Sequence, residues 1–143
     1  MNEDPSNMTD RSTELFEAAK SGMEKAHAPY SGFSVGAAVL ADNGQVYNGC
    51  NVENASYPEG WCAETSAIAA MVMGGGKRIV EACVIGNGDA LVTPCGGCRQ
   101  RLREFSSEGV RIHIAGPEGI RRTFTLGELL PASFGPENLE VGP

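Results

Sequence analysis

Apolar and polar residues alternate along the N-terminal part of the chain with the spacing of an α-helix. Over residues 12–26 the apolar side chains Leu15, Ala19 and Met23 recur every four positions, with charged residues between them. This period places the apolar side chains on one face. The pattern predicts a first amphipathic helix.

The next segment changes to the pattern of paired strands. The run VGAAVLA at residues 35–41 is short and wholly apolar, which suits a central strand, and QVYNGCNV at residues 45–52 is expected to return as the second strand. Between them, residues 42–44 read Asp-Asn-Gly, a strong turn signal. The segment therefore predicts a β-hairpin.

The remaining chain predicts two more helices, separated by strands. The segment WCAETSAIAAM at residues 61–71 is apolar enough for a buried helix, which ends at the three glycines 74–76. In PCGGCRQRLREF at residues 94–105, a proline precedes apolar residues at helical spacing, which predicts another helix. In chain order we expect a helix over 61–73, a strand over 79–86, a helix over 95–105, a strand over 110–114 and a short strand or helix within 123–134.

This order of elements predicts an α/β domain. We expect a three-layer α/β/α arrangement around a mixed, roughly five-stranded sheet, in which the first pair of strands is antiparallel and later strands are joined by crossover helices. Residues 1–10 are acidic and polar and are predicted to form a flexible tail, and residues 11–143 are predicted to form one domain.

Composition narrows the possible functions. With 41% hydrophobic and 20% charged residues the chain has a globular composition, and no apolar run approaches the length of a membrane span. Its formal charge of -7 disfavours binding to nucleic acid. The N-terminus lacks a secretory signal, so we expect a cytoplasmic, reducing location in which the five cysteines stay reduced.

Three of the cysteines lie at predicted helix starts. Cys62 begins one helix, and Cys95 and Cys98 straddle the start of the next. When helices follow parallel strands, their N-termini lie together at one edge of the sheet. The positive end of each helix dipole stabilises a thiolate, so the three sulfurs suit a zinc site. Three protein ligands leave a place for water, which zinc ionises near neutral pH. Glu64 is then placed to shuttle the proton of that water.

Each of these features has a simpler explanation when taken alone. A CxxC pair such as Cys95 and Cys98 also occurs in redox proteins and in structural zinc sites, and Glu64 in a first helical turn is a common helix cap. Cys50 and Cys83 fall in predicted strands, where they are expected to be small core side chains. It is the combination of CAE, a gap of 33 residues from Cys62 to Cys95, and PCGGC that favours a catalytic metal centre.

The motifs resemble those of the small, homo-oligomeric, zinc-dependent cytidine deaminases of pyrimidine salvage. The resemblance covers nearly the whole chain, through the segments APYSGFSVGAAV, NGCNVENASY, CAETSAI, TPCGGCRQ and ELLPASF in that order. It implies hydrolytic deamination of free cytidine and 2′-deoxycytidine with release of ammonia. It also implies a Zn²⁺ cofactor, a nucleoside substrate, no nucleic-acid or membrane partner, and a homotetramer.

The resemblance also implies roles for single residues. Glu64 is the catalytic proton carrier, and the metal ligands are Cys62, Cys95 and Cys98. The implied substrate contacts are the pair Asn51 and Glu53 on the ribose hydroxyls, Phe33 packed on the pyrimidine, the backbone of Ala63 on the base, and Phe134 entering the site of a neighbouring subunit.

One position departs from the commonest pattern of the family. Many members read CAER, where the arginine offsets the charge of three thiolates, but Thr65 stands there in this chain. A hydroxyl donates a hydrogen bond to a sulfur without balancing its charge. Arg99 directly follows Cys98 and is the candidate for charge balance. Thr65 and Arg99 are thus both expected to contact the metal ligands and to tune the metal centre.

Three other functions remain open at this point. One is deamination of a related cytosine nucleoside such as blasticidin S on the same scaffold. Another is editing of nucleic-acid bases, for which a histidine in HAE and a basic surface would be expected. The third is a non-catalytic structural zinc protein, in which Cys50 or Cys83 would have to supply a fourth ligand.

Overall fold

The fold is built on one five-stranded mixed sheet. The computed structural model describes residues 5–139, with side chains from residue 11 onward. The strands stand in the order β2-β1-β3-β4-β5, and β3 and β4 are parallel while the other neighbours are antiparallel. In chain order the strands are β1 (Val35–Ala41), β2 (Val46–Cys50), β3 (Ile79–Gly86), β4 (Arg111–Gly116) and β5 (Gly119–Thr125).

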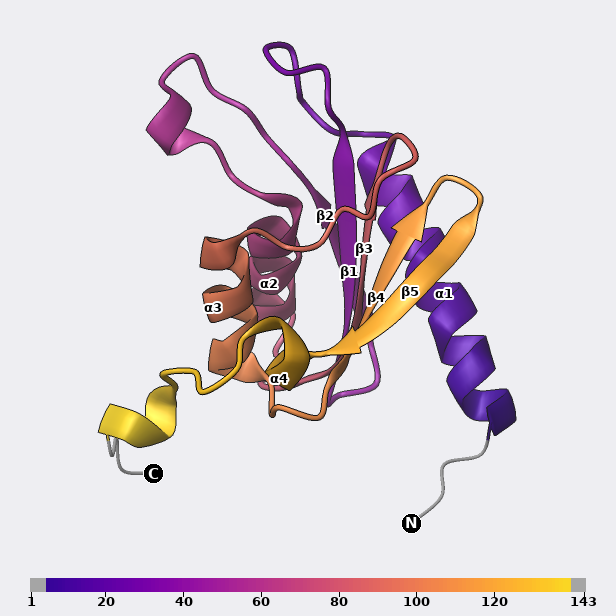
Figure 1. The fold of residues 1–143 in the computed structure, drawn as a ribbon, viewed down its shortest axis with the longest axis vertical. Helices are drawn as coiled ribbons and strands as arrows, with labels where there is room; N and C mark the ends of the chain where they lie inside the picture. Colours follow the sequence, from indigo (N-terminus) through magenta and orange to yellow (C-terminus); the bar gives the residue numbers. More distant parts are fainter. Residues whose placement is uncertain (1–4, 140–143) are drawn as a thin grey trace.

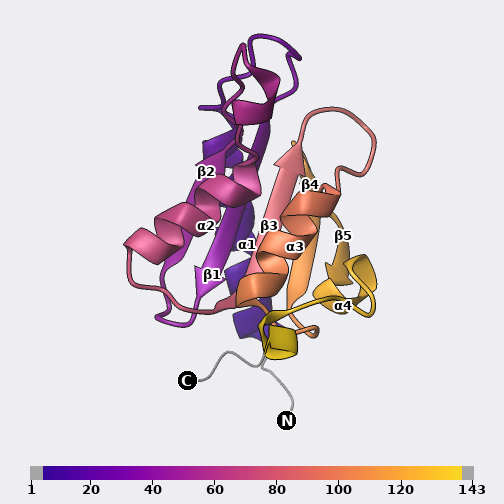
Figure 2. The same cartoon turned by 90° about the vertical axis from the view of Figure 1, so that its left-hand side faces the viewer.

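Helices cover both faces of this sheet. The helix α1 (Pro5–Met23) lies on one face, and α2 (Ala63–Met73) and α3 (Gly96–Phe105) lie side by side on the other (Figures 1 and 2). Shorter elements follow the loops: η1 (Tyr57–Glu59), α4 (Leu126–Leu129) and η2 (Pro136–Leu139). The predicted three-layer α/β/α architecture is confirmed. No helix of residues 5–139 combines the length and apolar character needed to cross a bilayer.

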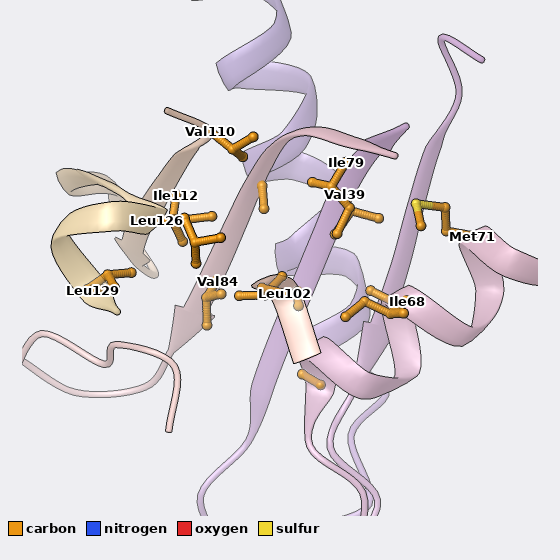
Figure 3. Close-up of a cluster of buried hydrophobic side chains, with 14 of the residues drawn as sticks. Val39, Ile68, Met71, Ile79, Val84, Leu102, Val110, Ile112, Leu126 and Leu129 are labelled. Carbon is orange, nitrogen blue, oxygen red and sulfur yellow. The ribbon is translucent and has the colours of Figure 1, made fainter. Parts of the chain in front are cut away.

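The position of β1 between two helical layers explains why its sequence is wholly apolar. Successive side chains of a strand point to opposite faces. Val39 belongs to the core under α2 and α3, whereas Leu40 packs in the core under α1. Figure 3 shows the first of these cores, where Leu102 of α3 and Ile68 of α2 meet the sheet. A fully buried side chain such as Leu102 contributes about 2 kcal/mol to stability.

The first helix begins earlier than predicted. The pattern placed it over residues 12–26, but α1 runs from Pro5 to Met23, so residues 5–10 of the predicted tail are helical, and residues 1–4 lie outside the described residues. Proline suits the first turn of a helix because it needs no hydrogen-bond partner there. The polar residues of this turn show no apolar period, so the sequence pattern does not predict it as helix. The predicted apolar face is confirmed, since Leu15 and Ala19 are fully buried.

The C-terminal segment contains both a strand and a helix, where the sequence left the choice open. The strand β5 starts at Gly119 and forms an antiparallel hairpin with β4, and α4 follows directly. A capping box explains the change at this point, because the Thr125 hydroxyl accepts from the Glu128 backbone N–H at 3.2 Å while the Glu128 carboxylate accepts from the Thr125 N–H at 2.8 Å.

Candidate metal centre and active site

The topology brings the starts of α2 and α3 to the same end of the sheet. Both β2 and β3 are antiparallel to β1, so they run in the same direction, and each is followed by one of these helices. Cys62 is the N-cap residue of α2 and Cys95 is that of α3, with Cys98 in the first turn after it. The predicted convergence of the three cysteines is therefore found (Figure 2 shows the two helices side by side).

The three sulfurs have the spacing that a zinc ion requires. The Sγ atoms of Cys62, Cys95 and Cys98 all lie within 4.8 Å of one another, and those of Cys62 and Cys95 are 3.9 Å apart. Tetrahedral Zn–S bonds of about 2.3 Å place sulfurs roughly 3.8 Å apart. Thiolates are also the soft ligands that zinc binds well. The residues present therefore fit a zinc ion with three protein ligands.

Cys50 and Cys83 do not join this group. All five cysteines are free thiols, and Cys83 lies in the core under α1, on the other face of the sheet. Burial raises the pKa of Cys83 to about 12, so it is an uncharged core side chain at neutral pH. Within the described residues the candidate metal group contains three ligands and no fourth. A closed structural site of four thiolates is therefore not formed.

The electrostatics of the cysteines show why a cation belongs here. Burial raises the pKa of the Cys62 thiol and of the Cys98 thiol, and the nearby charge of Glu64 adds to both shifts. Burial also acts on Cys95, but hydrogen bonds from Cys98, including its backbone N–H, hold the pKa of Cys95 below its ordinary value. A divalent cation reverses the preference for uncharged thiols because it stabilises thiolates directly.

Glu64 lies where the sequence predicted it, beside the three sulfurs. Its side chain is buried, at 5% exposure, and it lines the same cavity as Cys62 and Cys95. Burial raises the pKa of Glu64, although backbone hydrogen bonding, Cys98 and the charge of Arg101 act in the opposite direction. A carboxyl group whose pKa is moved toward neutrality is suited to accept and release protons.

The cavity in front of the sulfurs is large enough for a small ligand. Its volume is about 610 Å³, within the range of ligand-binding pockets. Ala63 and Glu64 line it together with Cys62 and Cys95, and Asn51 and Glu53 also line it. The residues that line it include two glutamates but no lysine, arginine or histidine. The cavity therefore suits an uncharged polar ligand better than an anion.

Glu53 is a carboxylate held in place by its neighbours. Its Oε1 accepts hydrogen bonds from the backbone N–H groups of Tyr30 and Ser31, at 2.9 and 3.1 Å, and its Oε2 accepts from the Ser31 hydroxyl. These hydrogen bonds, that of the Ser31 hydroxyl above all, hold the pKa of Glu53 below its ordinary value. A fixed, ionised carboxylate is a good acceptor for hydroxyl groups of a ligand.

Asn51 has a structural role as well as a place in the cavity wall. Its Oδ1 accepts from the Val35 N–H and its Nδ2 donates to the Phe33 carbonyl, both at 2.9 Å. The amide thus ties the loop before β1 to the end of β2. This use of both ends of the side chain could not be inferred from the CNVEN motif.

The two predicted aromatic contacts lie outside the set of residues that line the cavity. The ring of Phe33 packs close to Gly86, where an added Cβ would lie 3.1 Å from Phe33 Cζ. Phe134 is 57% exposed in the C-terminal segment, and its carbonyl accepts from Gln100 Nε2 at 2.8 Å. Within this chain the structure therefore does not bring Phe134 to the metal centre.

Thr65 contacts a sulfur, but Arg99 is not the arginine that does so. The Thr65 hydroxyl lies 4.0 Å from Cys98 Sγ. Arg99 instead donates to the Pro94 carbonyl at 2.7 Å, the Leu129 carbonyl at 2.8 Å and the Thr93 hydroxyl at 3.0 Å. It is Arg101 Nη1 that donates to Cys98 Sγ, at 3.6 Å. Arg99 thus braces the loop before Cys95, and Arg101 supplies the charge at the sulfur.

Sequence reasoning also missed the aromatic rim of the cavity. Tyr30, Tyr57 and Trp61 line it, with the two tyrosine rings edge to face at 6.0 Å. Trp61 immediately precedes Cys62, so its place beside a predicted metal ligand indicated that it would lie near the cavity. Tyr30 and Tyr57 come from separate loops, and their approach follows from the fold alone.

Comparisons with known proteins agree on one family. A family model described as the cytidine and deoxycytidylate deaminase zinc-binding region matches residues 9–114. Among curated proteins, the cytidine deaminase of Mycobacterium tuberculosis H37Rv is 48% identical over 115 residues, covering 80% of this chain and 82% of that protein. The cytidine deaminase of Sporosarcina psychrophila is 37% identical over 125 residues, covering 87% of this chain and 92% of that protein.

Solved structures give the same result. The crystal structure of cytidine deaminase from Burkholderia pseudomallei superimposes with a TM-score of 0.80 at 40% sequence identity, covering 85% of this chain and 98% of that one. The cytidine deaminase of Mycobacterium tuberculosis superimposes with a TM-score of 0.74 at 39% identity, covering 86% of this chain and 96% of that one.

Proposed function

The chain belongs to the cytidine and deoxycytidylate deaminase family of zinc enzymes, and on this premise we propose that it deaminates free cytidine and 2′-deoxycytidine. The products are uridine or 2′-deoxyuridine and ammonia. The observation that carries the proposal is the buried carboxyl of Glu64 beside three converging cysteine sulfurs, at the end of a cavity that an uncharged nucleoside suits.

The cysteines Cys62, Cys95 and Cys98 hold the zinc ion in this proposal. When bound, zinc would act as a Lewis acid that lowers the pKa of a water molecule enough for it to lose a proton near neutral pH. Each cysteine keeps its place through the start of a helix, so the three sulfurs are positioned before the metal binds.

Glu64 carries the protons of the reaction. Its carboxylate takes a proton from the attacking water and delivers it to the ring nitrogen next to carbon 4 of the pyrimidine. The oxygen of the water bonds to carbon 4, the second water proton goes to the amine by way of Glu64, and the C–N bond breaks to release ammonia. One water is consumed and Glu64 returns to its starting form.

Glu53 and Asn51 bind the ribose in the proposal. The Glu53 carboxylate accepts from a ribose hydroxyl, and the Asn51 amide lies beside it on the cavity wall. The backbone of Ala63 contacts the base, and Phe33 packs on the pyrimidine once the substrate is bound. This pairing of residues favours an ordinary ribose over the modified sugar of blasticidin S.

The charge of the site favours a nucleoside over a nucleotide. The lining of the cavity contains two carboxylates and no basic side chain, and the chain carries a formal charge of -7. A phosphate or a nucleic-acid polymer would bring negative charge into this environment without a partner. We therefore place the reaction in salvage of free nucleosides, in a reducing cytoplasmic compartment that keeps the thiols reduced.

A homotetramer is the assembly that accompanies this function in the proposal. Phe134 is largely exposed and lies outside the cavity of its own chain, so it is available to enter the site of a neighbouring copy. Sedimentation equilibrium with wild-type protein and with Phe134→Ala tests this arrangement. A wild-type protein that stays monomeric while turning over cytidine would contradict it.

The decisive assay follows loss of cytidine absorbance in the ultraviolet with purified protein. We expect turnover of cytidine and deoxycytidine, little turnover of deoxycytidine monophosphate, and loss of all activity when a chelator removes zinc. Zinc-loaded protein that leaves both nucleosides unchanged would refute the proposal.

A further inference from the structure

Arg101 is a cation placed directly against the metal centre. Its Nη1 donates to Cys98 Sγ at 3.6 Å, and Cys98 is fully buried. The two residues are three positions apart on α3, so they share a face of the helix. Among the described residues, Arg101 is the only arginine or lysine that hydrogen bonds to one of the three sulfurs.

The chain leaves space for this guanidinium. A Cβ added at Gly97 would lie 3.3 Å from Arg101 Nη1, closer than ordinary contact, so a side chain at that position would crowd the arginine. Thr65 touches the same sulfur with a short side chain, and Thr65 and Arg101 together line the two small cavities beside the metal centre. A long side chain at position 65 would compete for the same space.

Arg101 approaches from outside the substrate cavity. Neither Arg101 nor Cys98 lines the large cavity that contains Glu64 and Asn51. The positive charge therefore reaches the sulfur without entering the space of a ligand, which keeps that space free of basic side chains.

The other nearby arginines are engaged elsewhere. Arg99 donates to two backbone carbonyls and the Thr93 hydroxyl, and Arg103 pairs with Ser133 and Glu137. Three thiolates on a divalent ion leave a net charge of -1, to which Glu64 adds another negative charge. A guanidinium at hydrogen-bond distance from one sulfur reduces this excess, and partners of this kind change metal affinity by about 10- to 100-fold.

We propose that Arg101 is the positioning residue that balances the thiolate charge of the metal centre, in the space that Thr65 leaves open. This inference deepens the proposed function, since it concerns the metal centre that the deamination requires. It predicts that the charge of Arg101 controls how tightly the three cysteines bind metal, whether or not a substrate is present.

The test compares Arg101→Gln, Arg101→Ala and Arg101→Lys with a matched control, Arg122→Ala. Arg122 is an exposed arginine that stacks on Phe124 in the edge strand β5, so the control removes the same charge from a residue of the sheet edge. Zinc affinity is measured by competition with a chromophoric chelator, and the thiolate-to-metal absorption band is recorded after cobalt replaces zinc. The thermal stability of each metal-free protein is measured alongside.

We expect Arg101→Gln and Arg101→Ala to weaken zinc binding by at least tenfold and to shift the cobalt band, while Arg101→Lys keeps part of the affinity and Arg122→Ala matches the wild type. The metal-free proteins should melt at nearly the same temperature. Adding Thr65→Arg to Arg101→Ala should restore zinc affinity, because position 65 reaches the same sulfur.

Two results would overturn the proposal. The first is zinc affinity and a cobalt band within twofold of wild type in Arg101→Gln and Arg101→Ala. The second is a loss of affinity that accompanies an equal loss of stability in the metal-free proteins and that Thr65→Arg does not restore. Since these readouts need no turnover, a wild-type protein that binds zinc but leaves cytidine unchanged would refute the proposed function while leaving the role of Arg101 intact.

Discussion

Gly49 of β2 is the point at which the sheet fixes the position of the helix that carries Cys62 and Glu64. A Cβ built at Gly49 would lie 2.5 Å from the Ala67 backbone nitrogen and 2.6 Å from Ser66 Cβ. Neither atom belongs to the flexible end of a side chain, so α2 itself would have to move. Gly49→Ala therefore tests whether close packing of α2 on β2 positions the metal centre.

The expected displacement follows from these distances. Ordinary contacts of a Cβ begin near 3.4 Å, so α2 has to shift outward by about 1 Å. Overpacking of this size destabilises a protein by about 2 kcal/mol. For a chain of this length that lowers the Tm by roughly 6 °C. A shift of about 1 Å at a catalytic group reduces turnover by about 100-fold.

The assay measures unfolding in urea, zinc affinity and cytidine turnover for Gly49→Ala and for Gly109→Ala. Gly109 makes a matched control because an added Cβ there meets nothing within 4 Å. We expect Gly49→Ala to lose stability, zinc affinity and turnover, and Gly109→Ala to resemble the wild type. If the two variants behaved alike in all three measurements, the argument that β2 positions α2 would be refuted.

Three further predictions concern charged side chains. Glu81→Gln should destabilise the protein by about 2 kcal/mol at pH 7, because it removes a buried carboxylate that hydrogen bonds to His113 and pairs with Arg111. Burial raises the pKa of Glu81, but His113 and Arg111 hold this pKa below its ordinary value of 4.5. The contribution of Glu81 to stability is therefore present above pH 4.5 and is lost as the pH falls through the pKa of the folded state. Urea unfolding from pH 7 to pH 3 should show the free energies of unfolding of wild type and variant converging. Arg99→Ala should lower the free energy of unfolding in urea by about 2 kcal/mol, because it removes hydrogen bonds to two carbonyls. It should weaken zinc binding less than Arg101→Ala does, and an equal loss of zinc affinity would contradict the separate roles of the two arginines. Glu53→Gln should raise the KM for cytidine about tenfold with a smaller change in kcat, and steady-state kinetics with an unchanged KM would exclude Glu53 from ribose binding.

The sequence predicted most of the elements around the site because their signals are local. The wholly apolar run of β1, the Asp-Asn-Gly turn after it and the three glycines after α2 each depend on a few neighbouring residues. The convergence of the three cysteines was also predictable, since it follows from two helices that begin after strands running in the same direction.

Which arginine reaches a sulfur depends on helix geometry and not on adjacency in the sequence. Arg99 is next to Cys98 in the sequence, but adjacent residues on a helix point about 100° apart. Arg101, three positions after Cys98, shares its face and reaches its sulfur. Helical spacing could have identified it. The double use of the Asn51 amide and the meeting of Tyr30 with Tyr57 depend on loop conformations that no local pattern specifies.

The role of Glu64 is tested by comparing zinc content and cytidine turnover in wild-type protein and in Glu64→Gln. The amide has nearly the same shape as the carboxyl group and cannot carry the proton, so the variant should keep one zinc per chain while its kcat falls by at least 100-fold. A variant that kept both its zinc and full turnover would contradict the role of Glu64 as the proton carrier.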